Sequence, residues 1–418
     1  MDRLQKEKII FIAAVFFMNY RVNLIGAMSL TEIFVVTQIP HLLRWLNTQG
    51  KKIPHLCRIV KAFYWLIAVQ IVAEFMVHNT LINAAKGIAV TIMALFLMLF
   101  FLQKLVNNIS LIIWIPICNI LGLIIFGDQF GYADVDDASY FKFYIAPILT
   151  SAVCVITCLN WKFLRGYFFY IILGISLFII AGGARSSGFS LLFAAMFFFL
   201  YDKYRIVKLK RIIPGVVVGL LIIQLFLSFV YMPKVKNGEW GTEQNRSQFE
   251  KIDWNPNIFM ILLSARTDFF VSTIAFMDKP LWGHGSWAID RSGRYHILQA
   301  KLMEDEYKIN PEVKNLIPCH SVVMGKGVSN GIFAFSIFLW IFIYIYCIGF
   351  KGLYKSSPYN IFLLWTIISS FQHLLFGPPA ILKNNAAIAL AIMFALLYFK
   401  LRRIKEVKNS MMITKHYV

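Results

Sequence analysis

The feature that most constrains the fold is a series of long apolar runs that contain no charged side chain. A helix needs about 20 apolar residues to cross the hydrocarbon core of a bilayer, with ~17 as a practical lower limit. The clearest runs are Gly87–Gln103, Ile109–Gly127, Phe143–Trp161, Gly166–Ala184, Ile212–Pro233, Gly331–Phe350 and Pro358–Gly377. Because so much apolar surface cannot all be buried in a water-soluble core, the sequence predicts a polytopic, all-α integral membrane protein.

Five further runs are shorter or contain a single acidic residue. They are Ile9–Tyr20, Val22–Leu43, Ala62–His78, Ser186–Tyr201 and Asn384–Phe399. We therefore expect about 12 transmembrane helices, with helices 1–9 in residues 1–233 and helices 10–12 in residues 331–418, before a basic cytoplasmic tail. The composition agrees, since only 15% of residues are charged, against about a quarter in soluble domains. This excludes cytosolic enzymes and DNA-binding factors.

The distribution of basic residues predicts the orientation of these helices. The net charge is +20. If the N-terminus is cytoplasmic, the cytoplasmic segments hold 24 basic and 4 acidic residues, while the spans and outer loops hold 17 of each. This is the positive-inside pattern, so we expect both termini in the cytoplasm. The basic clusters then set orientation and contact anionic lipid headgroups rather than nucleic acid.

A long outer loop, residues 234–330, separates helix 9 from helix 10. Within it, Asn257–Met277 is apolar but carries Arg266 and Asp268 at its centre. Counting it as a span would place the basic tail outside, so we expect a short amphipathic helix on the membrane surface. A second, hydrophilic helix is expected around Ile297–Tyr307, with Glu304–Glu306 in it. Loops of this length are usually functional.

Another outer loop, Asp128–Tyr140, carries Asp134, Asp136 and Asp137. Closely spaced carboxylates can hold a divalent cation. The same pattern is common in solvated loops, and this interpretation is favoured here. We therefore expect no metal site.

An arginine lies in a turn between two predicted spans, in the sequence Gly182-Gly183-Ala184-Arg185-Ser186-Ser187-Gly188. An arginine at this place is costly unless it is paired or faces water. The surrounding glycines and serines would bring backbone amides close to a ligand, which suits a phosphate group. The alternative is an ordinary turn whose arginine extends to lipid headgroups. We favour a binding role for Arg185.

Three further motifs lie in the long outer loop, on the same side of the membrane. The first is Arg266 in Leu263–Phe270, the second is Pro280-Leu281-Trp282-Gly283-His284-Gly285, and the third is His320-Ser321, before Gly331-Ile332-Phe333-Ala334. A histidine at a membrane entrance is usually a structural hydrogen-bonding residue. Its pKa also suits a general base near neutral pH.

The order of these motifs resembles the bacterial O-antigen ligase and O-antigen polymerase superfamily, whose members handle glycans linked to undecaprenyl diphosphate. The family pattern is an arginine opening a loop helix, a Pro-(Leu/Trp)-x-Gly-x-Gly stretch, and His-(Asn/Ser) before Gly-(Ile/Leu)-x-(Gly/Ala) at an apolar span. The resemblance covers the layout of the spans and is specific over residues 182–340. Ligases often have His-Asn where this chain has His320-Ser321, which favours the polymerase branch.

The resemblance implies a GT-C-like membrane glycosyltransferase of the bacterial inner membrane, with its active site facing the periplasm. Its donor would be an undecaprenyl diphosphate-linked glycan, and its acceptor a sugar hydroxyl of another lipid-linked repeat unit of an O-antigen or a capsule. His320 would be the catalytic base, while Arg185 and Arg266 would bind the diphosphate. His284, Arg294 and Lys326 would be candidate contacts for sugar or phosphate.

The expected reaction needs no metal and no cofactor, because diphosphate is a good leaving group once its charge is stabilised. Guanidinium groups supply that stabilisation. A single displacement would invert the anomeric carbon. The expected partners are the lipid-linked donor and acceptor, membrane lipids, and a chain-length regulator protein. Two alternatives remain open: a ligase that transfers the glycan to lipid A-core, and a transporter or flippase of lipid-linked glycans.

Overall fold

The computed structural model covers the 418-residue chain. It describes every residue except 1, 24–26, 128–136, 160–165, 205–220, 222–223, 241–245, 247–248, 251–252, 256–266, 304–315, 355–356, 384 and 417–418. Arg266 therefore lies outside the described residues, as do Asp134, Asp136, Glu304–Glu306 and half of the expected span Ile212–Pro233.

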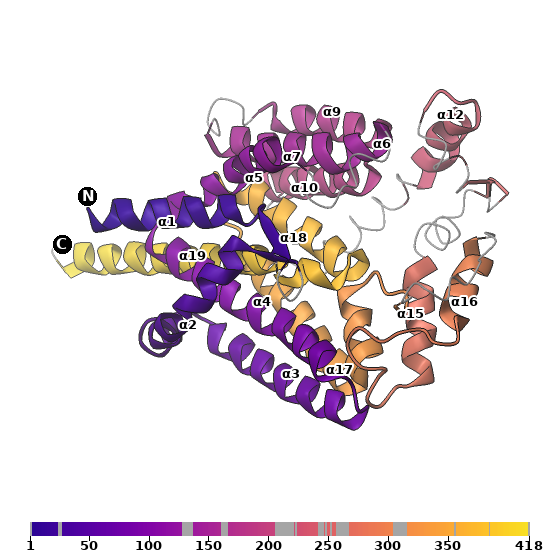
Figure 1. The fold of residues 1–418 in the computed structure, drawn as a ribbon. Helices are drawn as coiled ribbons and strands as arrows, with labels where there is room; N and C mark the ends of the chain where they lie inside the picture. Colours follow the sequence, from indigo (N-terminus) through magenta and orange to yellow (C-terminus); the bar gives the residue numbers. More distant parts are fainter. Residues whose placement is uncertain are drawn as a thin grey trace.

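The helices and strands of the described chain are all helices apart from one short hairpin (Figure 1). The first part of the chain forms α1 (Arg3–Phe17), β1 (Arg21–Asn23), β2 (Ala27–Ser29), α2 (Leu30–Thr48), η1 (Gly50–Lys52), α3 (Leu56–Met76), α4 (Leu81–Asn107), η2 (Ile109–Ile113) and α5 (Trp114–Phe126). The middle part forms α6 (Asp137–Tyr140), η3 (Phe141–Ile145), α7 (Ala146–Leu159), α9 (Phe168–Ala181), α10 (Arg185–Tyr204), η4 (Leu227–Tyr231) and α12 (Met232–Lys236). The last part forms α15 (Thr267–Asp278), α16 (Arg294–Met303), α17 (Val322–Lys351), α18 (Asn360–Phe376), η5 (Pro379–Lys383) and α19 (Asn385–His416).

Six of the described helical segments are long and apolar enough to cross a membrane. They are Leu56–Met76, Leu81–Asn107, Ile109–Phe126, Phe141–Leu159, Val322–Lys351 and Ile381–Val407. Three shorter apolar helices, Phe168–Ala181, Arg185–Tyr201 and Asn360–Phe376, lie where the sequence predicts spans. The chain is thus a helical, membrane-embedded protein.

The predicted span Val22–Leu43 is wrong in its first third. Arg21–Asn23 and Ala27–Ser29 pair as an antiparallel hairpin, in which Val22 lies opposite Met28. The following helix, α2, begins only at Leu30, because Ser29 has an extended backbone and its hydroxyl accepts a hydrogen bond from the Glu32 amide at 3.2 Å. Ser29-Leu30-Thr31-Glu32 is a capping-box sequence, so the sequence did contain a signal for this helix start.

The predicted span from Gly331 forms the second part of a longer, broken helix. The helix α17 begins at Val322, so residues 322–330, assigned to the outer loop, are helical. Ser321 caps this helix, since its hydroxyl accepts a hydrogen bond from the Met324 amide at 3.1 Å. Gly331 is a break within α17, with φ 73° and ψ −168°.

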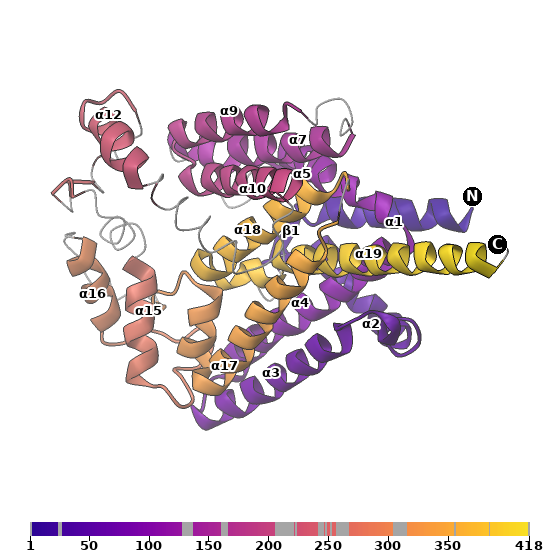
Figure 2. The same cartoon turned by 180° about the vertical axis from the view of Figure 1, so that it is seen from behind.

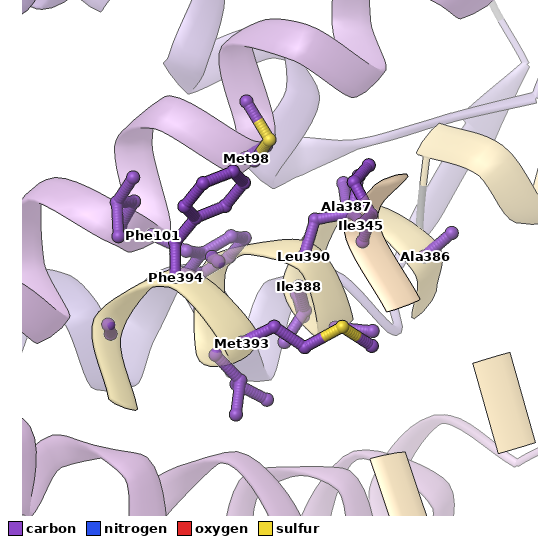
Figure 3. Close-up of a cluster of buried hydrophobic side chains, with 14 of the residues drawn as sticks. Met98, Phe101, Ile345, Ala386, Ala387, Ile388, Leu390, Met393 and Phe394 are labelled. Carbon is purple, nitrogen blue, oxygen red and sulfur yellow. The ribbon is translucent and has the colours of Figure 1, made fainter. Parts of the chain in front are cut away.

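One part of the bundle, the packed half, is formed by α3, α4, α17 and α19, which are neighbours in space. Every residue of α4 from Met93 to Gln103 is buried, and so is every residue of α19 from Ala386 to Leu397. Met98 and Phe101 of α4 lie toward Phe394 of α19 in this interface (Figure 3). Helices that are buried on all sides belong to the centre of a membrane bundle.

The other part, the cavity half, is formed by α5, α7, α10 and α18, with α9 against α10. Both chain ends lie at one end of the molecule, whereas α15 and α16 lie at the opposite end, which we call the loop end (Figures 1 and 2). The start of α17 also lies at the loop end, beside α15.

Candidate active site

His320 and Asp268 come together at the loop end. His320 lies in the extended segment directly before the capping residue of α17, and Asp268 lies in the first turn of α15. The His320 Nδ1 atom is 3.8 Å from Asp268 Oδ2, and their side chains are 55% and 30% exposed. Asp268 is fixed from its other side by α16, where Gln299 Nε2 donates a hydrogen bond to Asp268 Oδ1. Three helices therefore converge on one histidine–carboxylate pair.

This arrangement suits a general base. A carboxylate facing one ring nitrogen orients the imidazole and leaves the other nitrogen, Nε2, directed away from it. The exposure of His320 keeps it within reach of a substrate. In enzymes without bound substrate such contacts are often longer than a hydrogen bond, so the distance of 3.8 Å is consistent with this role.

Cys319, the neighbour of His320, is not suited to nucleophilic chemistry. Desolvation raises the pKa of its thiol to about 11, so the thiol is protonated at neutral pH. Its Sγ atom donates to the carbonyl oxygen of Ser321 at 3.5 Å. Since the thiolate is the reactive form, Cys319 is a packing residue.

Arg185 begins α10 and contacts an aromatic cluster on a different segment. Its guanidinium carbon lies 5.9 Å from the ring centres of both Tyr231 and Phe249, a distance at which cation–π attraction operates. The glycines beside it have packing roles: a Cβ atom on Gly182 would overlap Phe141, and one on Gly188 would lie 2.6 Å from Ile180. They allow α9, α10 and η3 to approach closely.

The segment Pro280–Gly285 supplies hydrogen-bond partners to backbone groups on either side of the break in α17. Gly331 leaves the helical conformation, so nearby backbone groups lose their partners within the helix. The amides of His284 and Gly285 donate to the carbonyls of Val328 and Ser329 at 2.7 and 2.9 Å, and the Ile332 amide donates to Pro280 at 2.7 Å. We call this backbone junction the splice.

Glycines make the splice possible. Gly283 has φ 75°, and a Cβ atom there would lie 2.6 Å from the carbonyl oxygen of Val328. A Cβ atom on Gly331 would overlap the carbonyl oxygen of Leu281. The glycine motif thus has a structural explanation in close backbone contact.

His284 is held inside the splice. Its Nε2 atom lies 2.8 Å from the carbonyl oxygen of Ala275, so this nitrogen carries a hydrogen and donates it. Burial lowers the pKa of His284 below its usual value, and the ring is neutral at pH 7. We therefore assign His284 a structural role rather than a contact with sugar or phosphate.

Arg294 and Lys326 each have a partner other than the His320–Asp268 pair. Arg294 begins α16 and pairs with Asp278 on the surface, with Nη1 3.1 Å from Oδ2. Lys326 lies in α17 and is buried against α4, where its Nζ atom donates to Thr91 Oγ1 at 2.9 Å. The structure therefore groups His320 with Asp268 and Gln299, and not with these two cations.

A buried carboxylate, Glu74 at the end of α3, anchors the splice to the bundle. It accepts hydrogen bonds from the Ser286 amide at 3.0 Å, from the Ser286 hydroxyl, from Asn79 Nδ2 at 2.6 Å and from Asn330 Nδ2 at 2.9 Å. Gly87 gives Ser286 room, because a Cβ atom there would overlap the Ser286 side chain. The sequence shows Glu74 as an acid within a span, which is the signal that it has a specific partner.

A cavity of about 400 Å³, with both polar and apolar side chains in its walls, lies inside the cavity half. Residues of α5, α7, α10, α18 and α19 line it, together with Arg21 of β1 and Lys142 of η3. Its α18 wall carries Thr366, Ser369, Ser370 and His373. These four polar residues recur at helical spacing, so the sequence held a signal for this face that was missed.

The outer turns of α18 connect this cavity to the His320 pair. Ser190, one turn after Arg185, donates to Gln372 in the wall of the cavity. One turn further along α18, the Phe376 ring lies 5.9 Å from that of Phe269, the neighbour of Asp268. The helix that begins at Arg185 and the helix that carries Asp268 therefore both contact the last turns of α18.

Within the described residues, no three His, Cys, Asp or Glu side chains come together to form a site that could hold a metal ion. The chain matches no protein-family model and no curated protein.

Proposed function

We propose that this protein is a polysaccharide polymerase of the bacterial inner membrane. It transfers a glycan from undecaprenyl diphosphate to a sugar hydroxyl of another lipid-linked repeat unit. The observation that carries the proposal is the His320–Asp268 pair, in which an exposed imidazole is oriented by a carboxylate that α16 holds in place. The pair lies at the loop end, which we place in the periplasm from the charge asymmetry.

The proposed reaction is a direct displacement. The His320 Nε2 atom accepts the proton of the acceptor hydroxyl. The oxygen of that hydroxyl forms a bond to the anomeric carbon, the bond from that carbon to the diphosphate oxygen breaks, and the diphosphate leaves with the electron pair. Attack from the opposite face inverts the anomeric centre. Arginine, which stays charged and offers several donors, suits the departing diphosphate.

Arg185 is the described residue that we propose for the diphosphate. Arg185 is the first residue of α10. Ser190 in the same helix donates a hydrogen bond to Gln372 of α18. The rings of Tyr231 and Phe249 lie at a distance from the Arg185 guanidinium carbon at which cation–π attraction operates. We assign Arg266 the same role from the sequence motif alone.

The test replaces His320 in a host strain that lacks the chromosomal gene. A His320→Ala variant should insert normally and yield single repeat units in place of long chains. The expected loss of rate is about 10²–10⁴-fold, the usual contribution of a general base. Cys319→Ser, at the adjacent residue, is the matched control and should keep the normal ladder of chain lengths. A normal ladder with His320→Ala would contradict the proposal.

A transporter of lipid-linked glycans is the second candidate, and two observations favour it. Transporters commonly bind substrate at broken helices within the membrane, and α17 is broken at Gly331. The cavity inside the bundle is of a size that small-molecule sites have, about 300–1,000 Å³. The His320→Ala experiment separates the two functions, because a transporter has no need of a base and would still deliver its substrate.

A further inference from the structure

Basic side chains surround the Tyr344 hydroxyl, at the end of the bundle opposite the loop end. His55 directly precedes α3, Arg58 lies in the first turn of α3, and Lys351 is the last residue of α17. The Tyr344 hydroxyl lies 2.6 Å from His55 Nδ1, and Arg58 Nη1 donates to it at 3.4 Å. We call these four residues the basic cluster. It joins the beginning of α3 to the last turns of α17.

Acidic side chains do not neutralise the basic cluster. Burial lowers the pKa of His55, and the positive charges of Lys351 and Arg58 lower it further. In the part of the chain that the structure describes, neither of these two cations pairs with an acid. The lowered pKa of His55 therefore marks an unbalanced positive charge at this place.

The hydrogen bonds within the cluster leave donors over. Arginine can only donate, so the Tyr344 hydroxyl accepts from Arg58. We assign the hydrogen of this hydroxyl to His55 Nδ1, which places the ring hydrogen of the neutral imidazole on Nε2. The remaining donors are this Nε2 group, the rest of the Arg58 guanidinium and the Lys351 ammonium, and the side chains of Arg58 and Lys351 are exposed. Such a set of donors matches the oxygens of a phosphate group.

Lys400 prevents the end of α17 from repelling an anion. The last carbonyl groups of a helix carry partial negative charge. Lys400 Nζ donates to the carbonyl oxygens of Lys351 and Leu353, both at 2.7 Å, and so covers these groups with a cation. The helix α3 begins beside the cluster at Leu56, and its N-terminus adds partial positive charge. The helix ends therefore do not oppose an anion here.

Toward the middle of the bundle, both helices present apolar side chains outward. Trp340 stacks on Tyr344 with ring centroids 4.8 Å apart and is 44% exposed, and Trp65, two turns after Arg58, is 68% exposed. From Trp340 to Lys351 the helix rises about 16 Å at about 1.5 Å per residue, close to half of the roughly 30 Å hydrocarbon core. Exposed cations at the end of an apolar stripe one leaflet long match the headgroup and acyl chains of a phospholipid.

We propose that the basic cluster binds the phosphate of one anionic phospholipid, whose acyl chains lie along Trp340 and Trp65. Arg58 and Lys351 hold the phosphate, and the Tyr344 hydroxyl keeps Arg58 in position. The lipid lies in the leaflet that the charge asymmetry places on the cytoplasmic side. Such a site differs from the general attraction of basic loops to a membrane, because defined donors hold a single lipid. Binding at this place is independent of the proposed function.

The experiment uses the purified full chain in a neutral detergent and counts bound lipid molecules by native mass spectrometry. The probes are phosphatidylglycerol and phosphatidylcholine with the same acyl chains. The competitors are inorganic phosphate and glycerophosphoglycerol, which is the headgroup without its chains. One phosphatidylglycerol should bind in preference to phosphatidylcholine, and neither soluble competitor should displace it.

Two variants locate the bound lipid. Arg58→Gln combined with Lys351→Gln should weaken binding of phosphatidylglycerol by about 30-fold, since each basic residue near an anionic lipid contributes roughly a factor of five. Tyr344→Phe keeps every charge and the stack on Trp340. It should weaken binding by about 2- to 10-fold, because Arg58 loses the hydroxyl that positions it.

The matched control for the double variant is Lys6→Gln combined with Arg44→Gln. It removes two exposed cations, which belong to α1 and α2 and not to the basic cluster. The loss of charge is the same, so binding of phosphatidylglycerol should stay at the wild-type value. All variants should unfold near the wild-type temperature in phosphatidylcholine. If the double variant fails to fold, the wild-type lipid preference and Tyr344→Phe still decide.

Four results would overturn the inference. Equal binding of the two lipids by the wild type would mean that no anion site exists. Displacement by phosphate or by glycerophosphoglycerol would assign the cluster to a soluble phosphate compound. Equal losses in the two double variants would reduce the effect to general charge attraction, and unchanged binding in Tyr344→Phe would remove the fixed geometry. None of these results bears on the proposed function, which His320→Ala tests separately.

Discussion

The packed half and the cavity half are built from similarly apolar helices, yet they differ in what lies between the helices. Between α4 and α19, consecutive residues are buried on all sides, with side chains such as Met98, Phe101 and Phe394 (Figure 3). In the cavity half, α5 buries only Pro116, Cys118 and Gly122, and polar groups line an open space. Apolar composition favours a helix in the membrane. The polar side chains between two helices determine whether they pack in contact or leave a cavity.

The largest expected effect is in the packed half. Phe101→Ala removes a fully buried ring that contacts Phe11 and Phe100. The loss of packing and the cavity left behind should lower the free energy of unfolding by about 3–5 kcal/mol. The measurement is thermal or denaturant unfolding in detergent.

Phe229→Ala is the control for this prediction. The Phe229 side chain is 76% exposed, so its loss should change stability little. If both substitutions lowered the free energy of unfolding equally, packing in the packed half would contribute no more to stability than an exposed side chain does. The contrast between the two halves would then be wrong.

Many of the helix positions could be predicted from the sequence, because long uncharged runs have few alternatives in a membrane protein. The run Gly87–Gln103 lies within a described helix, and the run Ile109–Gly127 matches the helical segment Ile109–Phe126 to within one residue. The start of α17 at Val322 and the hairpin before α2 could not be predicted from hydropathy. Both depend on serine caps and on contacts between distant segments, which hydropathy does not measure.

The candidate site was predicted only in part for the same reason. His320 could be selected from its motif, but its nearness to Asp268 depends on how α15, α16 and α17 pack. His284 in the Pro280–Gly285 motif is predicted to contact sugar or phosphate, whereas the backbone bonds of this motif to α17 explain its glycines. A glycine pattern alone does not distinguish close approach of a ligand from close approach of another strand of the same chain.

An intermediate effect is expected from Glu74→Gln, which tests how the splice is held to the packed half. The carboxylate accepts from Ser286, Asn79 and Asn330. The glutamine amide has the same shape but only one oxygen. Its NH₂ group faces N–H or O–H groups that had donated to the second carboxylate oxygen, so these buried donors lose their acceptor. Stability should fall by about 1–3 kcal/mol, measured by the same unfolding assay.

Lys234→Gln is the control for Glu74→Gln, because its surface pair with Glu239 is exposed and such pairs contribute little. The effect of Glu74→Gln should be local to the splice, with hydrogen exchange increasing around residues 280–286. If exchange increased equally in α5 and α7, Glu74 would be supporting the whole bundle rather than one junction.

The smallest expected effect is a pH dependence confined to the splice. Burial lowers the pKa of His284, so the unfolded state binds a proton more readily than the folded state does. The stabilisation is therefore present above the usual histidine pKa of about 6.5 and decreases as the pH falls below it. Asp278 and Lys279 face the ring and modify this pKa in opposite directions, while Asp290 has a lowered pKa and stays ionised throughout the measurement.

Hydrogen exchange at pH 5 and 7.5, corrected for the intrinsic rate, should show faster opening of residues 280–286 at the lower pH and no change in α4. A splice that is equally protected at both values would mean that His284 titrates alike in the folded and unfolded states, and that its contact with Ala275 does not hold the junction.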